Sequence, residues 1–298
     1  MNLEMYEALL KETAAKYSFS KINNDLNTTE VLRQKSPVCF LRHDIDFSPK
    51  NALRMAQLER QHDISSTYTV LLTGQYYNAF EKDIQETLKE IKSHGHEVGL
   101  HFDPTVYNVS DELSMSEHIK KEASALSDII GAPISMFSFH NTTDFSMNCR
   151  AQAYSGLVNA YSNFFHNDVE YTSDSNGYWR FRTWKELLLE NHKIIQVLTH
   201  PIWWEPKNEF PPLETVVKNL INRFDDGLQN YNYMFKGQNT RINKSVLENL
   251  LIRINKINDP KILNSYAKLS DLTTYLRSND FDGLIAQLHK LTEELNLK

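Results

Sequence analysis

Short apolar runs alternate with longer amphipathic stretches through the middle of this chain. The runs have the length and residue types of buried strands, and the stretches repeat apolar residues three or four positions apart, as helices do. We predict strands at 37–41, 66–72, 97–101, 134–139 and 194–198. We predict helices that begin at Ser48-Pro49 and that cover 84–94, 115–130 and 184–191. This alternation is typical of βαβ units and predicts an α/β fold with a parallel sheet, either a barrel or a doubly wound sheet.

The two ends of the chain differ from this repeating part. Residues 1–35 have a helical pattern followed by an asparagine-rich loop, and a proline-bearing break at 206–212 ends the repeating part. Beyond the break, leucine and isoleucine recur at helical spacing in a lysine- and asparagine-rich context. We therefore predict three parts, namely an N-terminal helix and loop at 1–35, an α/β barrel at 36–210 and a helical extension at 211–298 that packs on the barrel.

Polar side chains that can bind metals follow four of the predicted strands. The strings are His43-Asp44-Ile45-Asp46, His101-Phe102-Asp103, His140-Asn141 and His200. In parallel α/β folds the active site lies at the carboxyl ends of the strands, so these side chains are expected to meet. Imidazole and carboxylate together favour zinc or a similar divalent ion. Asp44 and Asp46 are two residues apart, so that one can bind the metal while the other accepts a proton.

Two of these strings carry a resemblance to a known family. Leu41 to Asp46, together with Gly95-His96-Glu97-Val98-Gly99-Leu100-His101, resembles the first two motifs of the NodB-type polysaccharide deacetylases, carbohydrate esterase family 4. The resemblance spans roughly 37–204 and implies that the chain is a divergent member of this family. It implies a distorted (β/α) barrel that removes N- or O-acetyl groups from sugars with a divalent metal.

The resemblance also implies roles for single residues. Asp44 matches the catalytic base, Asp46 the metal-binding aspartate, His101 the first metal-binding histidine, and His200 the late histidine that acts as general acid. The family's second ligand histidine is replaced by Thr105, and Phe137-Ser138-Phe139-His140 stands where the family has an arginine. We predict His140 as the third ligand, with Asp103 and His43 as alternatives, and zinc as the metal.

Four further residues are candidates for substrate binding. Trp203 and Trp204 follow His200 closely, and an indole face can stack on a sugar ring, although core packing explains them equally well. Arg180 could bind a carboxylate or phosphate, or be a solvated surface arginine. Asn141 could donate a hydrogen bond to the oxyanion of a tetrahedral intermediate.

Composition narrows the class of partner. The formal net charge is −6, and no block of basic residues supplies the positive surface that nucleic-acid binding needs. No apolar run reaches the roughly 20 residues of a membrane span, and the acidic start Met1-Asn2-Leu3-Glu4 does not resemble a secretory signal. Cys39 and Cys149 are expected to be reduced thiols. We therefore expect a cytoplasmic enzyme of surface-polysaccharide synthesis whose substrate is a carbohydrate or a nucleotide- or lipid-linked sugar.

Two other functions fit parts of the pattern. Thr105 and the missing arginine favour a non-catalytic carbohydrate-binding protein that keeps the fold, whereas the joint presence of Asp44, Asp46 and two histidines opposes it. A metal-free glycoside hydrolase would use Asp44 and Asp46 as its carboxylate pair. Such pairs stand roughly 5–9.5 Å apart across the sugar, which residues two apart on one strand hardly reach, and the histidines would have no role.

Overall fold

The computed structural model describes residues 1–206 and 211–234, and the chain divides into one compact unit at Met1–Arg223 and a second at Phe224–Lys298. Each predicted strand and helix of the repeating part is present. The strands are β1 Ser18–Ser20, β2 Val38–Ile45, β3 Thr67–Val70, β4 Glu97–Phe102, β5 Met136–Phe139, β6 Ala153–Tyr154, β7 Leu157–Asn159, β8 Glu170–Ser173 and β9 Ile194–Thr199. The helices are α1 Leu3–Ala14, α2 Thr28–Arg33, α3 Pro49–Gln61, α4 Lys82–Ser93, α5 Glu112–Ile130, α6 Asp144–Asn148, α7 Asn163–Asn167, α8 Trp184–Leu189 and α9 Pro212–Met234.

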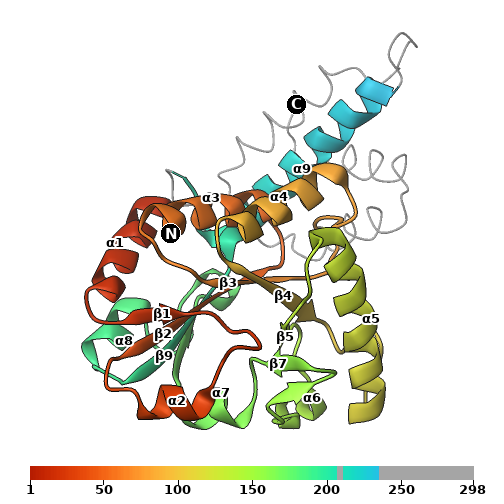
Figure 1. The fold of residues 1–298 in the computed structure, drawn as a ribbon. Helices are drawn as coiled ribbons and strands as arrows, with labels where there is room; N and C mark the ends of the chain where they lie inside the picture. Colours follow the sequence, from red (N-terminus) through yellow and green to blue (C-terminus); the bar gives the residue numbers. More distant parts are fainter. Residues whose placement is uncertain (207–210, 235–298) are drawn as a thin grey trace, which may run out of the picture. The chain divides into compact units, whose positions relative to one another are not determined.

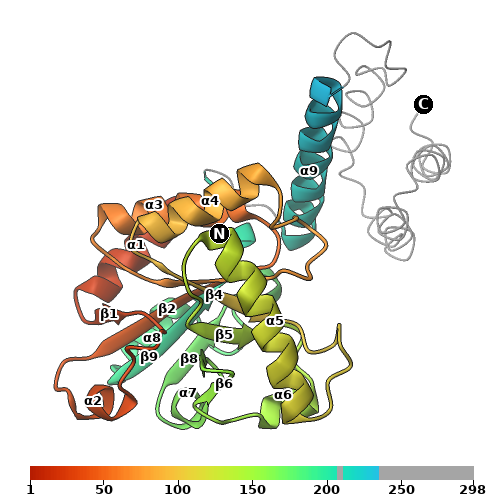
Figure 2. The same ribbon diagram turned by 45° about the vertical axis from the view of Figure 1, so that its right-hand side comes forward.

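The strands form one curved sheet in the order β6-β7-β5-β4-β3-β2-β9-β8, with β1 paired to β2 (Figures 1 and 2). All described pairs are parallel except β6 with β7. No described pairing joins the edge strands β6 and β8, so the barrel is open. The predicted α/β class and distorted barrel are confirmed. Residues 1–35 contribute α1 and β1 to this same unit.

Helices α8, α1, α3, α4 and α5 are neighbours in that order, and they cover one side of the sheet (Figure 1). Their apolar faces pack on the outward side chains of the strands, among them Tyr68, Val98 and Leu100. The helix that was expected to begin at Ser48-Pro49 does so because the Ser48 hydroxyl accepts the Asn51 N–H, while proline fits the first turn. The opposite, inward face of the central strands carries buried polar residues, among them Asp44, Thr69 and His101.

Strand β2 is longer than the sequence pattern predicts. The apolar run was expected to end at Leu41, but the strand continues to Ile45 through Arg42, His43 and Asp44, all of which are buried. Buried charges in a strand are tolerated where they pair with each other, as Arg42 and Asp44 do. The carboxyl end of β2 therefore delivers Asp44 and Asp46 to the inside of the barrel.

The first turns of α9 belong to the first unit, and Arg223 there donates to Glu81 at 2.7 Å. The periodic stretches of the predicted helical extension beyond residue 234 lie outside the described residues. Within the described part, no helix has the length and apolarity that a bilayer crossing requires.

Gly99 in β4 lies where a larger side chain would strike a neighbouring strand. A Cβ at Gly99 would overlap the Met136 sulfur and stand 3.0 Å from the Met136 carbonyl oxygen. We expect Gly99→Ala to lower the free energy of unfolding by about 1–3 kcal/mol, because overpacking forces strands β4 and β5 to shift. Urea titration measures the change. Gly227→Ala is the control, since nothing in the described structure lies within 4 Å of a Cβ there; equal stability of the two variants would contradict the prediction.

Candidate metal centre and active site

Strands β2, β4, β5 and β9 bring their polar ends together on the inner side of the sheet. Asp46 follows β2, His101 is in β4, His140 follows β5 and His200 follows β9. The His101 Nε2 atom lies 3.2 Å from Asp46 Oδ1, and the His200 Nε2 atom lies 3.8 Å from Asp46 Oδ2. The four strand ends singled out from the sequence thus converge around one carboxylate.

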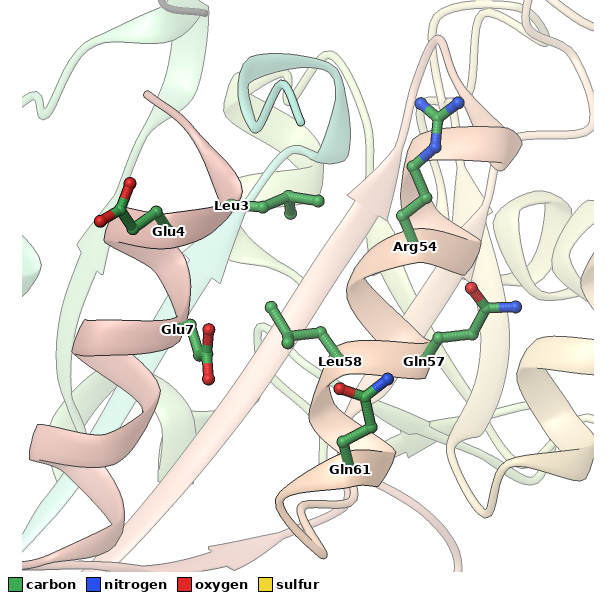
Figure 3. A pocket seen from close by; sticks show the side chains of 7 residues that line it. All are labelled: Leu3, Glu4, Glu7, Arg54, Gln57, Leu58 and Gln61. Atoms are coloured by element: carbon green, nitrogen blue, oxygen red, sulfur yellow. The ribbon is translucent and has the colours of Figure 1, made fainter. Parts of the chain in front are cut away.

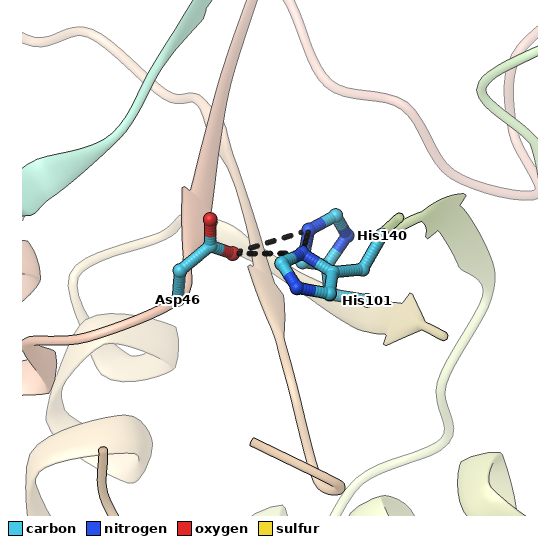
Figure 4. A group of neighbouring side chains, drawn as sticks. All are labelled: Asp46, His101 and His140. Atoms are coloured by element: carbon cyan, nitrogen blue, oxygen red, sulfur yellow. Dashed lines mark hydrogen bonds and ion pairs between the residues drawn. The ribbon is translucent and has the colours of Figure 1, made fainter. Parts of the chain in front are cut away.

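Asp46, His101 and His140 form a group that could hold a metal ion (Figure 4). The His140 Nδ1 atom lies 3.5 Å from Asp46 Oδ1 and 3.1 Å from His101 Nε2. Ligand atoms that surround zinc tetrahedrally at roughly 2.0–2.1 Å stand about 3.3 Å apart, so all three separations suit one shared ion. The buried Asp46 Oδ1 atom also has no hydrogen-bond partner in the described structure. Buried carboxylate oxygens normally have one, and a cation would supply it.

The electrostatics of Asp46 agree with a cation-binding role. Burial alone would raise the pKa of this carboxyl group, but the neighbouring imidazoles of His101, His140 and His200 outweigh it and hold the pKa well below its usual range. Burial would likewise lower the pKa of His140, and Asp46 reverses this and raises it. Asp46 is therefore ionised and attracts positive charge to the place where the two imidazole nitrogens meet.

Asp44 is held beside this group by other partners. Its Oδ1 atom accepts from the Thr69 hydroxyl at 2.6 Å, and its Oδ2 atom accepts from Arg42 at 3.2 Å. Burial alone would raise the pKa of Asp44, but the charge of Arg42 outweighs it and lowers the pKa overall. Asp44 is 2% exposed and its nearest approach to His101 Nε2 is 3.7 Å. It is an ionised carboxylate next to the candidate metal ligands without being one of them.

His200 is paired with an aspartate that the sequence pattern did not reveal. The His200 Nδ1 atom lies 2.7 Å from Asp174 Oδ1, which also accepts the His200 backbone N–H at 2.9 Å. Burial would lower the pKa of His200, but this pairing outweighs it and raises the pKa to about 9. The Nε2 atom, which faces Asp46, therefore carries a hydrogen at neutral pH and can donate it.

Sequence reasoning missed Asp174 and Arg42, which both pair with residues of the site. Asp174 follows the short strand β8, in a stretch of the chain whose pattern indicated no element. The available signal was that Ser173-Asp174 ends a fifth strand, in the same manner as the four strand ends already noted. Arg42 precedes Asp44 by two residues, so that both side chains lie on one face of β2.

Neither alternative third ligand joins the group. The carboxylate of Asp103 accepts from the Thr105 hydroxyl at 2.6 Å and from the Asn141 amide at 2.9 Å, so Thr105 and Asn141 both serve to hold Asp103. His43 was the other alternative, and the structure corrects it. Its ring points to the opposite face of β2 from Asp44, where it contacts Thr199 Oγ1 at 2.7 Å and Glu59 Oε1 at 3.0 Å.

The four residues predicted to bind substrate lie in different environments. Trp204 is 0% exposed and donates its indole N–H to Asp174 at 2.9 Å, which corrects the expectation that it stacks on a sugar. Trp203 is buried beside Phe47, with ring centroids 6.2 Å apart, and its indole N–H has no hydrogen-bond partner in the described structure. Arg180 is exposed on the loop after β8, where its backbone N–H donates to the Ser173 carbonyl oxygen at 3.4 Å. The Asn141 amide points to Asp103.

A surface pocket between α1 and α3 is separate from this site (Figure 3). Its lining consists of outward residues of the two helices, namely Leu3, Glu4, Glu7, Arg54, Gln57, Leu58 and Gln61. It contains none of the residues at the strand ends, so it takes no part in the candidate metal centre.

Comparison with known proteins returns structures and no sequences. No family model matches the chain, and neither does any curated protein. A family 4 carbohydrate esterase from Bacillus anthracis is 13% identical, with 75% of this chain and 86% of that chain covered and a TM-score of 0.39. The chitin deacetylase of the fungal pathogen Colletotrichum lindemuthianum is 15% identical, with 63% and 84% covered and a TM-score of 0.37.

A pseudoenzyme of carbohydrate esterase family 4 from Bacillus anthracis is 14% identical, with 65% of this chain and 62% of that chain covered and a TM-score of 0.34. Both Bacillus anthracis structures carry the name of carbohydrate esterase family 4, which is the family that the two sequence motifs resemble.

Proposed function

We propose that this protein is a divergent NodB-type deacetylase, a metal-dependent hydrolase that removes an acetyl or similar acyl group from an amino sugar or a related small amide. The observation that carries the proposal is the set of three ligand atoms on Asp46, His101 and His140, each within 3.5 Å of the other two. A metal site beside an ionised carboxylate (Asp44) and a protonated histidine (His200) provides the three groups that metal-assisted hydrolysis at a carbonyl group uses.

Asp46, His101 and His140 would hold the metal, for which the donor set suits zinc. A divalent ion bound there supplies Lewis acidity toward the acyl carbonyl and makes water a nucleophile near neutral pH. The residues of the chain then have distinct tasks. Asp44 accepts a proton from water as its oxygen forms the new bond to the acyl carbon. His200 gives its Nε2 proton to the leaving nitrogen as the carbon–nitrogen bond breaks, so a carboxylic acid and a free amine result.

The substrate is a carbohydrate, free or linked to a nucleotide or lipid, in the synthesis of a surface polysaccharide. Trp203 is the remaining aromatic candidate for a sugar contact, because its unpaired indole N–H is a hydrogen-bond donor without an acceptor in the described structure. Arg180, which is exposed on the loop after β8, would bind an anionic linker of the substrate. Asn141 would act through Asp103 instead of contacting the oxyanion.

A non-catalytic carbohydrate-binding protein with this fold is the second candidate. The observation in its favour is that Thr105, at the family's second ligand position, is bonded to Asp103 and offers no imidazole. Under this alternative the Asp44→Asn and His101→Ala variants would still complement a strain that lacks the gene. A hydrolase needs both residues, so neither variant would then complement it.

Metal analysis of the purified protein tests the proposal. We expect about one zinc ion per chain after incubation with zinc and removal of excess, together with acetate or formate release from acylamino sugars. His140→Ala should lose the bound zinc, because it removes one of three ligands. The control is His62→Ala, whose imidazole pairs with Glu7 on the helical side of the sheet. A wild-type protein that binds no divalent ion and hydrolyses none of the acylamino sugars would refute the proposal, and full zinc binding by His140→Ala would refute the assignment of the third ligand.

A further inference from the structure

A row of buried side-chain hydrogen bonds connects His101 with Asp44 behind the candidate metal ligands. His101 Nδ1 lies 2.7 Å from the Ser138 hydroxyl oxygen. The Ser138 hydroxyl donates to Thr69 Oγ1 at 3.1 Å, and the Thr69 hydroxyl donates to Asp44 Oδ1 at 2.6 Å. Ser138 and Thr69 are both 0% exposed, so no solvent competes for these bonds.

The sheet places these four residues in register. Asp44 of β2 is paired with Thr69 of β3, and His101 of β4 is paired with Ser138 of β5. Gly99 of β4 is the register partner of Thr69. Although β4 runs between their strands, the hydroxyl oxygens of Thr69 and Ser138 lie 3.1 Å apart.

The hydrogen bonds of this row all donate in one direction, toward Asp44. An ionised carboxylate can only accept hydrogen bonds, and the guanidinium of Arg42 beside Asp44 favours the ionised form. The Thr69 hydrogen therefore points to Asp44, and the Ser138 hydrogen points to Thr69. Each hydroxyl has a single hydrogen, so Ser138 has only a lone pair left for His101.

We propose that Asp44, acting through Thr69 and Ser138, fixes His101 in the tautomer that carries its hydrogen on Nδ1. In that tautomer the Nε2 lone pair faces Asp46 and His140, as a metal ligand requires. Thr69 and Ser138 are then positioning residues, and the carboxylate proposed as base also orients a metal ligand. The inference deepens the proposed function and rests on it for the role of Nε2.

The opposite tautomer would break the row. If His101 Nδ1 accepted a hydrogen bond, the Ser138 hydrogen would have to turn to it, and the contact between Ser138 and Thr69 would be left without a hydrogen. The groups that face His101 Nε2 are Asp46, His140 and Asp44, at 3.2, 3.1 and 3.7 Å. A hydrogen on Nε2 could bond to Asp46, but it would occupy the position from which the ring binds a cation.

Thr69→Val and Ser138→Ala test the proposal by two readouts other than activity. The first is the zinc dissociation constant of the full-length protein, measured by competition with a chelating dye. We expect both variants to bind zinc about 10–100-fold more weakly, the usual effect of removing a partner of a metal-binding histidine. Thr67→Val is the matched control, since Thr67 is an equally buried threonine of β3 whose hydroxyl accepts the Ile22 N–H; it should bind zinc as the wild type does.

The second readout is the ring-nitrogen NMR spectrum of the metal-free protein with ¹⁵N-labelled histidine, with the His101 signals assigned by their loss in His101→Ala. We expect the neutral ring to carry its hydrogen on Nδ1 in the wild type. In Thr69→Val the Ser138 hydroxyl has lost its acceptor, so it can turn toward Nδ1 and shift the hydrogen to Nε2. Thermal melting of each variant confirms that it is folded.

The outcomes separate this inference from the proposed function. Unchanged zinc affinity in both variants, or a hydrogen on Nε2 in the wild type, overturns the inference while the metal site stands. A wild-type protein that keeps its hydrogen on Nδ1 but binds no divalent ion overturns the proposed function, and with it the metal-ligand part of the inference.

Discussion

Asp44→Asn is expected to lower kcat for deacylation by about 10²–10⁴-fold, the usual contribution of a general base, while the protein still binds its divalent ion. The reason is the separation of tasks between the two aspartates at the carboxyl end of β2. Asp44 is bonded to Arg42 and Thr69, whereas Asp46 meets both imidazole nitrogens. The measurement combines kcat on an acylamino sugar that the wild type hydrolyses with the zinc content of the same preparation.

The control for this variant concerns stability. Asp44→Asn leaves the guanidinium of Arg42, which is 1% exposed, without its counter-charge, and a broken buried pair typically costs about 3–5 kcal/mol. Replacing both partners, in Arg42→Met with Asp44→Asn, removes the unpaired charge and should recover most of the lost stability without recovering kcat. Wild-type kcat in either protein would show that Asp44 is not the base.

The position of the site could be predicted from the sequence because its residues end apolar runs. Asp46, His101, His140 and His200 each follow or end a stretch whose pattern identifies it as a buried strand, and parallel strands present their carboxyl ends at one edge. Residues at strand ends can therefore lie close together in space however far apart they are in the sequence. The fold class alone was enough to predict that these four side chains lie near one another.

Which neighbour of a strand-end residue faces the site could not be predicted in the same way. His43 and Asp44 are adjacent and both buried, and the alternation along β2 sends one to the helices and the other to the barrel interior. A run that is buried on both faces has no polar–apolar alternation that distinguishes them. The tertiary contacts distinguish them. Thr199 Oγ1 and Glu59 Oε1 contact the His43 ring, whereas the Thr69 hydroxyl donates to Asp44.

The sequence pattern did not reveal Asp174 for a different reason. Strand β8 has four residues, and its burial changes from exposed at Glu170 to buried at Ser173, so the sequence there lacks the continuous apolar run that marks the other strands. Its partnership with His200 arises from the pairing of β8 with β9 at the edge of the sheet. The contact between Asp174 and His200 depends on this tertiary pairing, and no pattern in the neighbouring sequence indicates it.

Asp174→Asn is expected to move the alkaline limb of the kcat profile to lower pH, because the mechanism needs His200 with a hydrogen on Nε2. With Asp174 present, the pKa of His200 is raised to about 9, so the ring is mostly protonated at about pH 8. Without that charge the pKa should fall toward its ordinary value of about 6.5, at which roughly 3% of the ring would be protonated at that pH, while Asp46 and Asp44 still favour the protonated form. The expected loss of rate is therefore up to about 30-fold at about pH 8 and small at about pH 6. A bound cation lowers the pKa of His200 in both proteins, so the direction of the difference is unchanged.

Trp204→Phe is the matched control, because Trp204 donates to the other oxygen of Asp174 and leaves the contact with His200 in place. It should shift the limb much less than Asp174→Asn does. The two variants together separate the charge of Asp174 from its role in packing. If Asp174→Asn lowered kcat equally at all pH values, Asp174 would orient the ring without setting its proton affinity. If it changed kcat at no pH, His200 would not be the general acid, and the proton for the leaving nitrogen would have to come from another group.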